Sequence, residues 1–394
     1  MSEIKVNSIK GVAASSAAIT INNTDGTATA NLTNRQGKNL IINGAMNVAQ
    51  RSQSSTTSAS GYFACDRMRV SVFGLDEGIT IEQSALTSSD TPYTKGFRYA
   101  TKITNGNQTS GAGGTDTVNL MYRLEGQDIN NSGWDYTSAS SFVTISFWMK
   151  SSVAQTFYLR FRMTGSGSNK EFVSAISATT SWQKITKTIP GGTGVDSVNT
   201  NAEGGFLQIS LFRGTDQTGT LTTDQWNTHD ASAKVPDMTS TWYTTNDATF
   251  EITGLQMEVG SVATDFEHLS FADDLRKCQR YYFIYADGSG GVNQYQITNI
   301  HGYSTGQLET TIDYSCANLR AIPSLVQGSG TNYYNAVNAT AAINFNSFTA
   351  IYQPSSRKGL LYTNSTSGTT PVTGTAYRCQ FANNGAYIHL DAEL

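Results

Sequence analysis

The chain has 394 residues, of which 38% are hydrophobic and only 14% are charged, and its formal net charge is −4. The charged share is about half that of ordinary soluble domains, so few groups remain for acid–base chemistry. The charge balance gives no basic footprint for nucleic acid, and no run of about 18 apolar residues predicts insertion into a membrane. The opening MSEIKVNSIKGVAASS lacks the continuous apolar stretch of a secretion signal, so we expect assembly in a cytoplasm.

Residues 1–38 are small and polar, and two short alternating segments, 19–21 and 27–32, flank the turn signal Asp25-Gly26. This pattern predicts a thin hairpin or an extended strand pair. The segment holds too few large apolar groups to fold alone. We expect copies from several chains to wind together, or the segment to dock on a partner; disorder is the alternative.

From residue 39 onward, alternation of apolar and polar residues predicts strands. The clearest cover residues 142–150, 156–163, 206–213 and 250–259. In the last of these, Gly254 shifts the phase of the apolar positions, which indicates a β-bulge. Several short strands with Gly/Ser/Thr-rich turns favour a jelly roll or another β-sandwich over residues 39–270.

One helix is predicted at 271–283, because Ser270 can cap it and Asp273 and Asp274 suit its first turn. Residues 284–394 return to strands and turns, with strands expected at 302–313, 332–338 and 376–380 and after Asn384-Gly385. The fold class is therefore all-β: an extended N-terminal segment, a jelly-roll sandwich, a linking helix and a C-terminal β-sandwich.

The search for catalytic chemistry finds no HExxH, no GxSxG elbow and no phosphate-binding loop. The four cysteines are far apart, without zinc spacing, and we expect them to be buried reduced thiols. We therefore predict no catalytic residues, no cofactor and no enzyme. A structural calcium ion in an Asp/Asn-lined loop is the one metal that the sequence leaves open, although no EF-hand spacing is present.

Aromatic residues in polar, loop-like stretches are the better candidates for binding. Flat side chains cover the apolar faces of sugar rings, yet subunit contacts use the same residue types, and the sequence favours neither interpretation. The candidates before the helix are Trp134, Tyr136, Trp226, Trp242 and Tyr243.

An ordered set of segments resembles a carbohydrate-binding-like jelly-roll module of phage tail fibres and other virion structural proteins, often from marine phages. The segments are Asn39–Arg51 (NLIINGAMNVAQR), Asp66-Arg67, Leu124–Gln127, Ile145–Lys150, Trp182–Lys184, Phe250–Gly260, Ala263–Ser270 and Leu275–Tyr282. Met68 stands where the module usually has Trp, and a soft apolar side chain can fill that core position. Asn318–Ser324 and Asp391–Leu394 are similar to segments of trimeric fibre-tip domains.

The resemblance implies a homotrimeric tail fibre, assembled in the host cytoplasm and located in the virion. Residues 1–38 would anchor it to a tail adaptor, nozzle or other virion protein, and the tip, residues 284–394, would meet a host cell-surface glycan. Receptor contact in the tip is expected from Tyr285, Tyr295, Tyr303, Tyr333 and Tyr334. A purely architectural role as a capsid fibre, collar or tail-body component is the alternative. An envelope-polysaccharide depolymerase is disfavoured, because no β-helix repeat is present.

Overall fold

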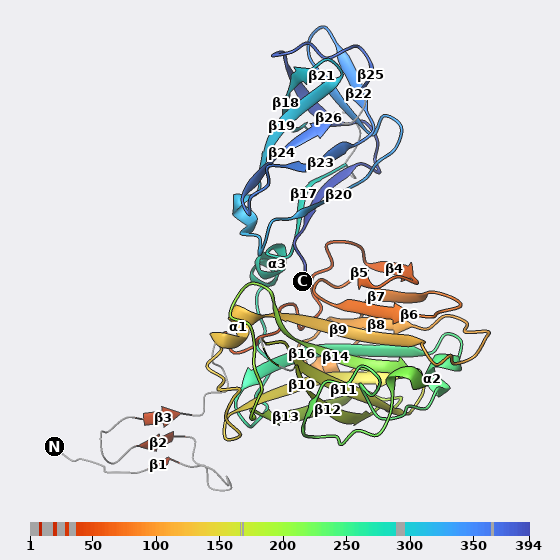
Figure 1. Ribbon diagram of the computed structural model, residues 1–394, viewed down its shortest axis with the longest axis vertical. Helices are drawn as coiled ribbons and strands as arrows, with labels where there is room; N and C mark the ends of the chain where they lie inside the picture. The colour runs from red at the N-terminus through yellow and green to blue at the C-terminus, as the bar shows by residue number, and fades with distance from the viewer. Residues whose placement is uncertain are drawn as a thin grey trace, which may run out of the picture.

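The computed structural model describes residues 8–9, 19–21, 28–30, 37–165, 167, 169–288, 296–363 and 366–394. The chain is all-β. Two β-sandwiches follow one another in the sequence, and helix α3 (Phe271–Gln279) lies between them (Figure 1). No helix among the described residues is long and apolar enough to span a membrane.

The N-terminal segment contains three short strands, β1 (Ser8–Ile9), β2 (Ile19–Ile21) and β3 (Ala28–Ala30). All neighbours pair antiparallel, with Ile19 opposite Ala30 and Ile21 opposite Ala28. The predicted strand pair is thus confirmed as β2–β3. The Asp25-Gly26 turn lies outside the described residues.

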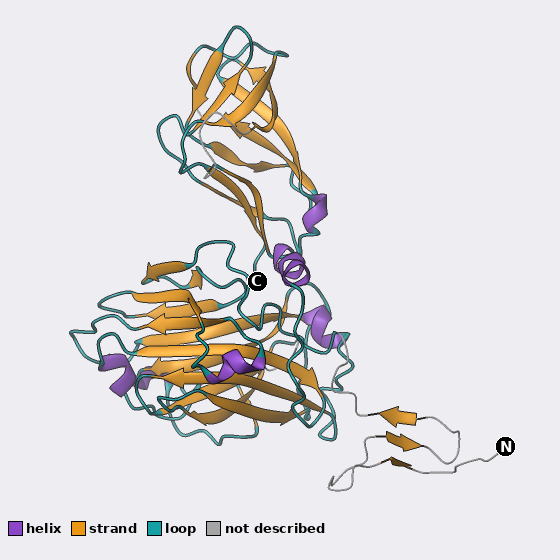
Figure 2. Cartoon of the chain, turned by 180° about the vertical axis from the view of Figure 1, so that it is seen from behind, coloured by secondary structure: helices purple, strands orange, loops and turns teal. Residues whose placement is uncertain are grey.

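The first sandwich consists of two antiparallel sheets that lie against each other as layers (Figure 2). The six-stranded sheet has the order β13 (Gln183–Pro190), β10 (Phe142–Ser151), β16 (Thr249–Val259), β8 (Tyr99–Thr104), β7 (Ile79–Ala85), β4 (Ser54–Thr57). The seven-stranded sheet has the order β15 (Trp226–Thr228), β12 (Lys170–Ser177), β11 (Thr156–Met163), β14 (Glu203–Arg213), β9 (Thr117–Glu125), β6 (Arg69–Phe73), β5 (Gly61–Tyr62).

The core between these sheets is built by the alternation seen in the sequence. Phe157, Leu159 and Phe161 of β11 point inward and are almost fully buried. Met68 is 1% exposed and belongs to the same core, so this methionine fills a core position as expected. All four strands predicted between residues 142 and 259 are present.

The bulge predicted at Gly254 is confirmed. The pairing of β10 with β16 shifts register between Ser146, opposite Gln256, and Trp148, opposite Thr253. Gly254 has a φ of +65°, a conformation that glycine adopts without strain. A Cβ at this position would lie 2.6 Å from the ring of Phe97, so both the backbone and the packing require glycine here.

The predicted helix is α3, and Ser270 caps it, since its side chain accepts a hydrogen bond from the backbone N–H of Asp273. The predicted end at residue 283 is wrong, because the helix ends at Gln279 and strand β17 already begins at Tyr282. Two further short helices, α1 (Gly126–Asn130) and α2 (Thr241–Thr244), were not predicted.

The second sandwich consists of a three-stranded sheet and an eight-stranded sheet. The smaller sheet has the order β17 (Tyr282–Asp287), β27 (Tyr387–Asp391), β20 (Ser324–Gln327). The larger has the order β23 (Phe348–Tyr352), β24 (Lys358–Thr363), β19 (Gln307–Asp313), β18 (Gln296–Ser304), β26 (Ala376–Phe381), β21 (Tyr334–Val337), β22 (Ala342–Phe345), β25 (Thr366–Gly368).

Two predictions are wrong in this region. Residues 302–313 are not one strand, because Gly306, with a φ of +89°, turns the chain between β18 and β19. Cys65, Cys278 and Cys379 are buried free thiols, but Cys316 is exposed. Cys316 lies in a short helical turn, Ser315–Ala317, in which Ala317 is buried and the cysteine side chain faces solvent.

Candidate functional site

The loop-like surroundings of the five aromatic candidates in the first sandwich suggested that these side chains are exposed. In the structure they are buried or half-buried. Trp134 and Trp242 are 4% and 0% exposed, and each indole N–H donates to a backbone carbonyl, that of Ser141 and that of Thr249. Tyr243 is 1% exposed and stacks on Phe212 at 4.3 Å. These three residues are core residues because folding back satisfies both the ring and its polar atom.

Tyr136 and Trp226 are half-buried and also pack on this core. The Tyr136 hydroxyl donates to Asn130, and the Trp226 indole donates to the carbonyl of Pro190. Each side chain therefore presents only part of its surface to solvent.

The tip candidates divide in the same way. Tyr334 is fully buried, and its hydroxyl contacts the carbonyls of Gly328 and Tyr387. Tyr285 and Tyr333 are half-buried against the core of the second sandwich. Tyr295 lies outside the described residues. Tyr303 is 52% exposed and is the one candidate that presents a ring to solvent.

Tyr303 belongs to a group of rings that the sequence did not predict. Its ring lies 5.2 Å from that of Tyr362, and Tyr362 lies 5.7 Å from Tyr352, both in edge-to-face contact. Tyr352 is 56% exposed and Tyr362 is half-buried. The three rings come from β18, β24 and β23 on the outer face of the eight-stranded sheet.

Two polar side chains border these rings. His301 Nε2 lies 2.8 Å from Glu309 Oε1 across the β18–β19 hairpin. Glu309 also stands opposite Tyr362, and its hydrogen bond with the Tyr362 hydroxyl, together with desolvation, raises the pKa of that tyrosine to about 12. We call Tyr303, Tyr352, Tyr362, His301 and Glu309 the tyrosine face.

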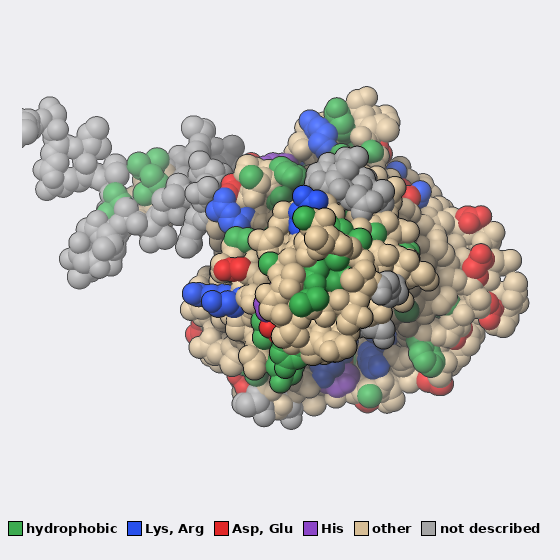
Figure 3. Space-filling model, turned by 90° about the horizontal axis from the view of Figure 1, so that it is seen from above, with side chains coloured by type: hydrophobic (Ala, Val, Ile, Leu, Met, Phe, Trp, Pro, Cys, Tyr) green, Lys and Arg blue, Asp and Glu red, His purple; other side chains and the backbone are tan. Residues whose placement is uncertain are grey.

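The sheet explains why these five side chains meet. The burial of β19 alternates strictly, with Leu308 and Ile312 in the core and Glu309 outward. Antiparallel register then places His301, Glu309 and Tyr362 side by side on neighbouring strands. Viewed from above, the C-terminal domain is largely uncharged, and its hydrophobic side chains gather in patches (Figure 3).

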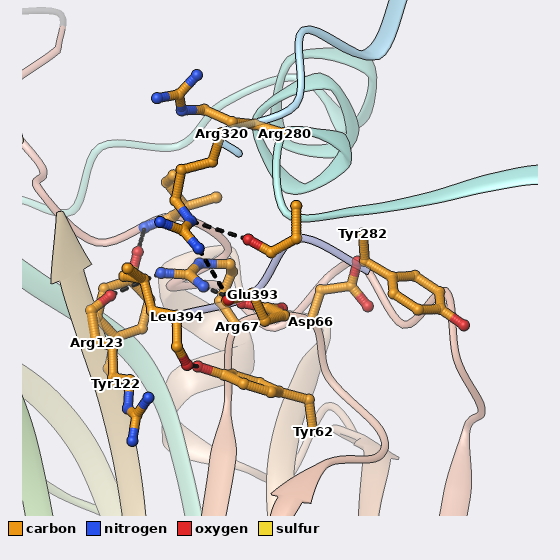
Figure 4. Close-up of polar contacts among 12 residues, drawn as sticks. Tyr62, Asp66, Arg67, Tyr122, Arg123, Arg280, Tyr282, Arg320, Glu393 and Leu394 are labelled. Atoms are coloured by element: carbon orange, nitrogen blue, oxygen red, sulfur yellow. Dashed lines mark hydrogen bonds and ion pairs between the residues drawn. The ribbon is translucent and has the colours of Figure 1, made fainter. Parts of the chain in front are cut away.

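A cluster of arginines fixes the second sandwich to the first (Figure 4). Arg280, at the end of α3, donates two hydrogen bonds of 2.9 Å to the buried carboxylate of Glu125 in β9. Arg320 donates to the carbonyls of Ala392 and Glu393 and to that of Asn201 in the first sandwich. The segment Asp391–Leu394 is thereby held between the two domains.

Glu393 is the centre of this cluster. Its side chain is 6% exposed and pairs with both Arg67 and Arg51. The Arg67 guanidinium lies 3.5 Å from the ring centroid of Tyr281, and that of Arg51 lies 3.7 Å from the ring centroid of Tyr282. Burial raises the pKa of Glu393 despite both arginines. Because the charges of Arg51, Arg67 and Glu393 are paired with one another between the two domains, this cluster has the geometry of an interdomain lock rather than of a ligand site.

No group of three or more His, Cys, Asp or Glu side chains that could hold a metal ion occurs among the described residues. This result gives no support to a structural calcium site in that part of the chain.

No protein-family model and no curated protein sequence matches the chain. Among solved structures, one similar protein is the enzymatically active domain of bacteriophage CBA120 tailspike protein 4, at 8% identity and a TM-score of 0.30. The match covers 56% of this chain and 21% of the tailspike chain.

Two other similar structures are described as sugar-binding proteins. A putative sugar-binding protein from Bacteroides thetaiotaomicron matches at 11% identity and a TM-score of 0.31, over 57% of this chain and 100% of its own. The module TmCBM61, in complex with β-1,4-galactotriose, matches at 8% identity and a TM-score of 0.24, over 57% and 100%. At these identities and TM-scores, the likenesses assign no ligand to this chain.

Proposed function

We propose that this chain is a non-enzymatic phage tail-fibre protein that binds a host surface glycan through the tyrosine face of its C-terminal domain. The observation that carries the proposal is the solvent-exposed group of Tyr303, Tyr352 and Tyr362 beside the polar pair His301 and Glu309. Most other large aromatic side chains of the two sandwiches are buried, so this surface is unusual within the molecule.

The chemistry suits a sugar. Tyrosine rings offer large, rigid and amphipathic contact area at a low cost in side-chain entropy. Apolar C–H faces of a pyranose can stack on Tyr303 and Tyr352, while Glu309 accepts and His301 exchanges hydrogen bonds with hydroxyl groups. A few convergent polar groups beside apolar area are typical of ligand sites.

The fibre role depends on the family resemblance and agrees with the arginine lock. A receptor-binding tip gains from a fixed orientation relative to the rest of the particle, and Arg280, Arg320 and Glu393 hold the tip on the first sandwich. In a homotrimer anchored to a tail adaptor or nozzle through residues 1–38, three weak sites act together and avidity exceeds the affinity of each site.

The experiment uses the full chain on an array of bacterial surface glycans. The proposal expects binding to at least one neutral glycan, and loss of that signal in Tyr303→Ala/Tyr352→Ala. Release of reducing ends from the bound glycan would instead indicate a depolymerase. Absence of binding by the unmodified chain to glycans and to host cells would refute the proposal.

The architectural alternative uses the same surface differently, because exposed tyrosines also suit contacts between subunits. Measuring the mass of the purified protein in solution, and thereby its oligomeric state, distinguishes the two roles. If Tyr303→Ala/Tyr352→Ala dissociates an oligomer, the tyrosine face is a subunit interface. If the oligomer is unchanged while glycan binding is lost, the face is a receptor site.

A further inference from the structure

The outer face of the seven-stranded sheet carries a row of basic side chains that crosses four neighbouring strands, β11, β14, β9 and β6. Phe206 of β14 stands opposite Arg123 of β9 on one side and opposite Arg162 of β11 on the other. Neighbouring strands lie about 4.8 Å apart, so the two arginines flank one phenylalanine ring. Arg69 of β6, opposite Met121, extends this group on the β9 side. We call Arg69, Arg123, Arg162 and Phe206 the arginine row.

The positive charge of the row is only partly balanced by the protein, because one carboxylate, that of Glu203, interacts with Arg69, Arg123 and Arg162 together. Arg123 pairs with Glu203 at 3.0 Å, but Arg69 and Arg162 have no carboxylate partner within ion-pair distance among the described residues. Burial, and secondarily the charge of Arg123, lower the pKa of Arg69, while Glu203 opposes this shift. The chain as a whole has a net charge of −4, so the positive excess of the row is local.

A neighbouring arginine on the same face of the sheet is fully paired, in contrast to Arg162. Arg160 lies two residues before Arg162 on the same face of β11. It is 3% exposed and donates hydrogen bonds to the buried carboxylate of Glu171 and to the amide oxygen of Gln208. His229, which follows β15, also contacts this carboxylate, with its Nδ1 3.0 Å from Glu171 Oε2. Arg162 lies on the same strand, yet its Nε is buried without a hydrogen-bond partner among the described residues.

Like charges on neighbouring strands destabilise a sheet, and a buried polar atom without a partner costs further stability. Departures of this kind concentrate at functional sites. A carboxylate is the natural complement, since guanidinium groups bind it with two parallel hydrogen bonds. Phe206 is only 6% exposed, and the guanidinium groups of Arg160 and Arg162 lie 5.2 and 5.8 Å from its ring centroid, so its role is to support the arginines from below.

We propose that the arginine row binds an acidic polysaccharide, with uronate carboxylates held by Arg69, Arg123 and Arg162. This site is separate from the tyrosine face and does not depend on it. A polyanion as highly charged as nucleic acid suits the row less well, because the chain as a whole is acidic and the aromatic ring of the row, Phe206, is buried and cannot stack on a base.

The test measures binding of the full chain to polygalacturonate, with dextran as the neutral polymer. The variant is Arg69→Gln/Arg162→Gln, which leaves the Arg123–Glu203 pair in place. The matched control is Lys95→Gln/Lys184→Gln, which removes two exposed positive charges elsewhere on the first sandwich. We expect affinity for polygalacturonate to fall by at least about tenfold in the arginine variant only, and to weaken with salt.

Stability provides the second readout. Removal of two cations that lack an ion-pair partner should leave the melting temperature unchanged or raise it, whereas a structural role predicts a lower one. The proposal is overturned if the unmodified chain does not bind polygalacturonate, if both double variants lose affinity equally, or if oligothymidylate binds more tightly. Tyr303→Ala must retain polygalacturonate binding, which separates failure of this site from failure of the tyrosine face.

Discussion

Arg67 of the first sandwich and Glu393, two residues beyond strand β27, form an ion pair with side chains only 1% and 6% exposed. Arg67 also lies against the ring of Tyr281, directly after α3, and donates to the backbone carbonyl of Arg123. A single guanidinium therefore contacts the first sandwich, the linking segment and the residues that follow the second sandwich. This pair couples the stability of one domain to the placement of the other.

Replacement of Glu393 by Ala should be strongly destabilising. The change leaves Arg67 buried without its carboxylate partner, which typically costs about 3–5 kcal/mol. Denaturant unfolding followed by fluorescence gives the value. The double variant Arg67→Met/Glu393→Leu should recover a large part of the loss, because apolar pairs often replace buried ion pairs well. Unfolding of Glu393→Ala at the same denaturant concentration as the unmodified chain would contradict the lock.

Acidification should weaken the second sandwich through His389. Burial lowers the pKa of this histidine to about 4, from an ordinary value of 6.5. Between pH 6.5 and about 4, His389 is therefore protonated in the unfolded chain but not in the folded chain. Stability is fully present above pH 6.5 and falls toward pH 4, by up to about 3 kcal/mol.

The measurement is the pH dependence of the unfolding free energy. His389→Gln should flatten the curve in this window. Equal slopes in the unmodified chain and in His389→Gln would show that other groups cause the acid sensitivity.

One of the four cysteines should react in the native state. Cys316 is exposed, while Cys65, Cys278 and Cys379 are buried, and desolvation raises the pKa of Cys65 to about 12. A thiol reagent followed by intact mass should add one label to the native chain and four after unfolding. Cys316→Ser should remove the native label. Native labelling of Cys65 or Cys379 would indicate that a sandwich opens.

Gly254→Ala should destabilise the first sandwich by roughly 2 kcal/mol or more, because the new Cβ needs an unfavourable φ and overlaps Phe97. Gly306→Asn is the matched comparison. It also has a positive φ, but open space surrounds its Cβ and Asn tolerates this conformation, so its cost should be smaller. Thermal unfolding compares the two, and equal losses would mean that packing against Phe97 contributes little.

Local pattern predicted the parts of the fold that depend on neighbouring residues. Alternation located β10, β11, β14 and β16, and the Ser270 cap located α3. The hairpin at Gly306 was missed although this glycine separates Tyr303 from the alternating segment that begins at Leu308. Burial of a loop residue such as Trp242 depends on the three-dimensional path of the loop, which the sequence alone does not state.

The candidate site was mostly missed for a related reason. Tyr303 was named, but Tyr352 and Tyr362 lie in strands whose alternation is obscured by consecutive apolar residues, as in Leu360–Leu361. His301 and Glu309 are eight positions apart and become neighbours only through the register of β18 and β19. A correct hairpin at Gly306 would have been the signal that pairs them.

The most direct test of glycan binding by the tyrosine face is calorimetric titration of the full chain with a soluble, monovalent fragment of the glycan that the array identifies. Tyr352→Ala should raise the dissociation constant by about tenfold or more, as expected for the loss of a central aromatic contact. Tyr352→Phe, which retains the ring, should bind almost normally. Tyr99→Ala, which removes an exposed tyrosine from the first sandwich, should bind like the unmodified chain. Unchanged affinity in Tyr352→Ala, or an equal loss in Tyr99→Ala, would contradict the account.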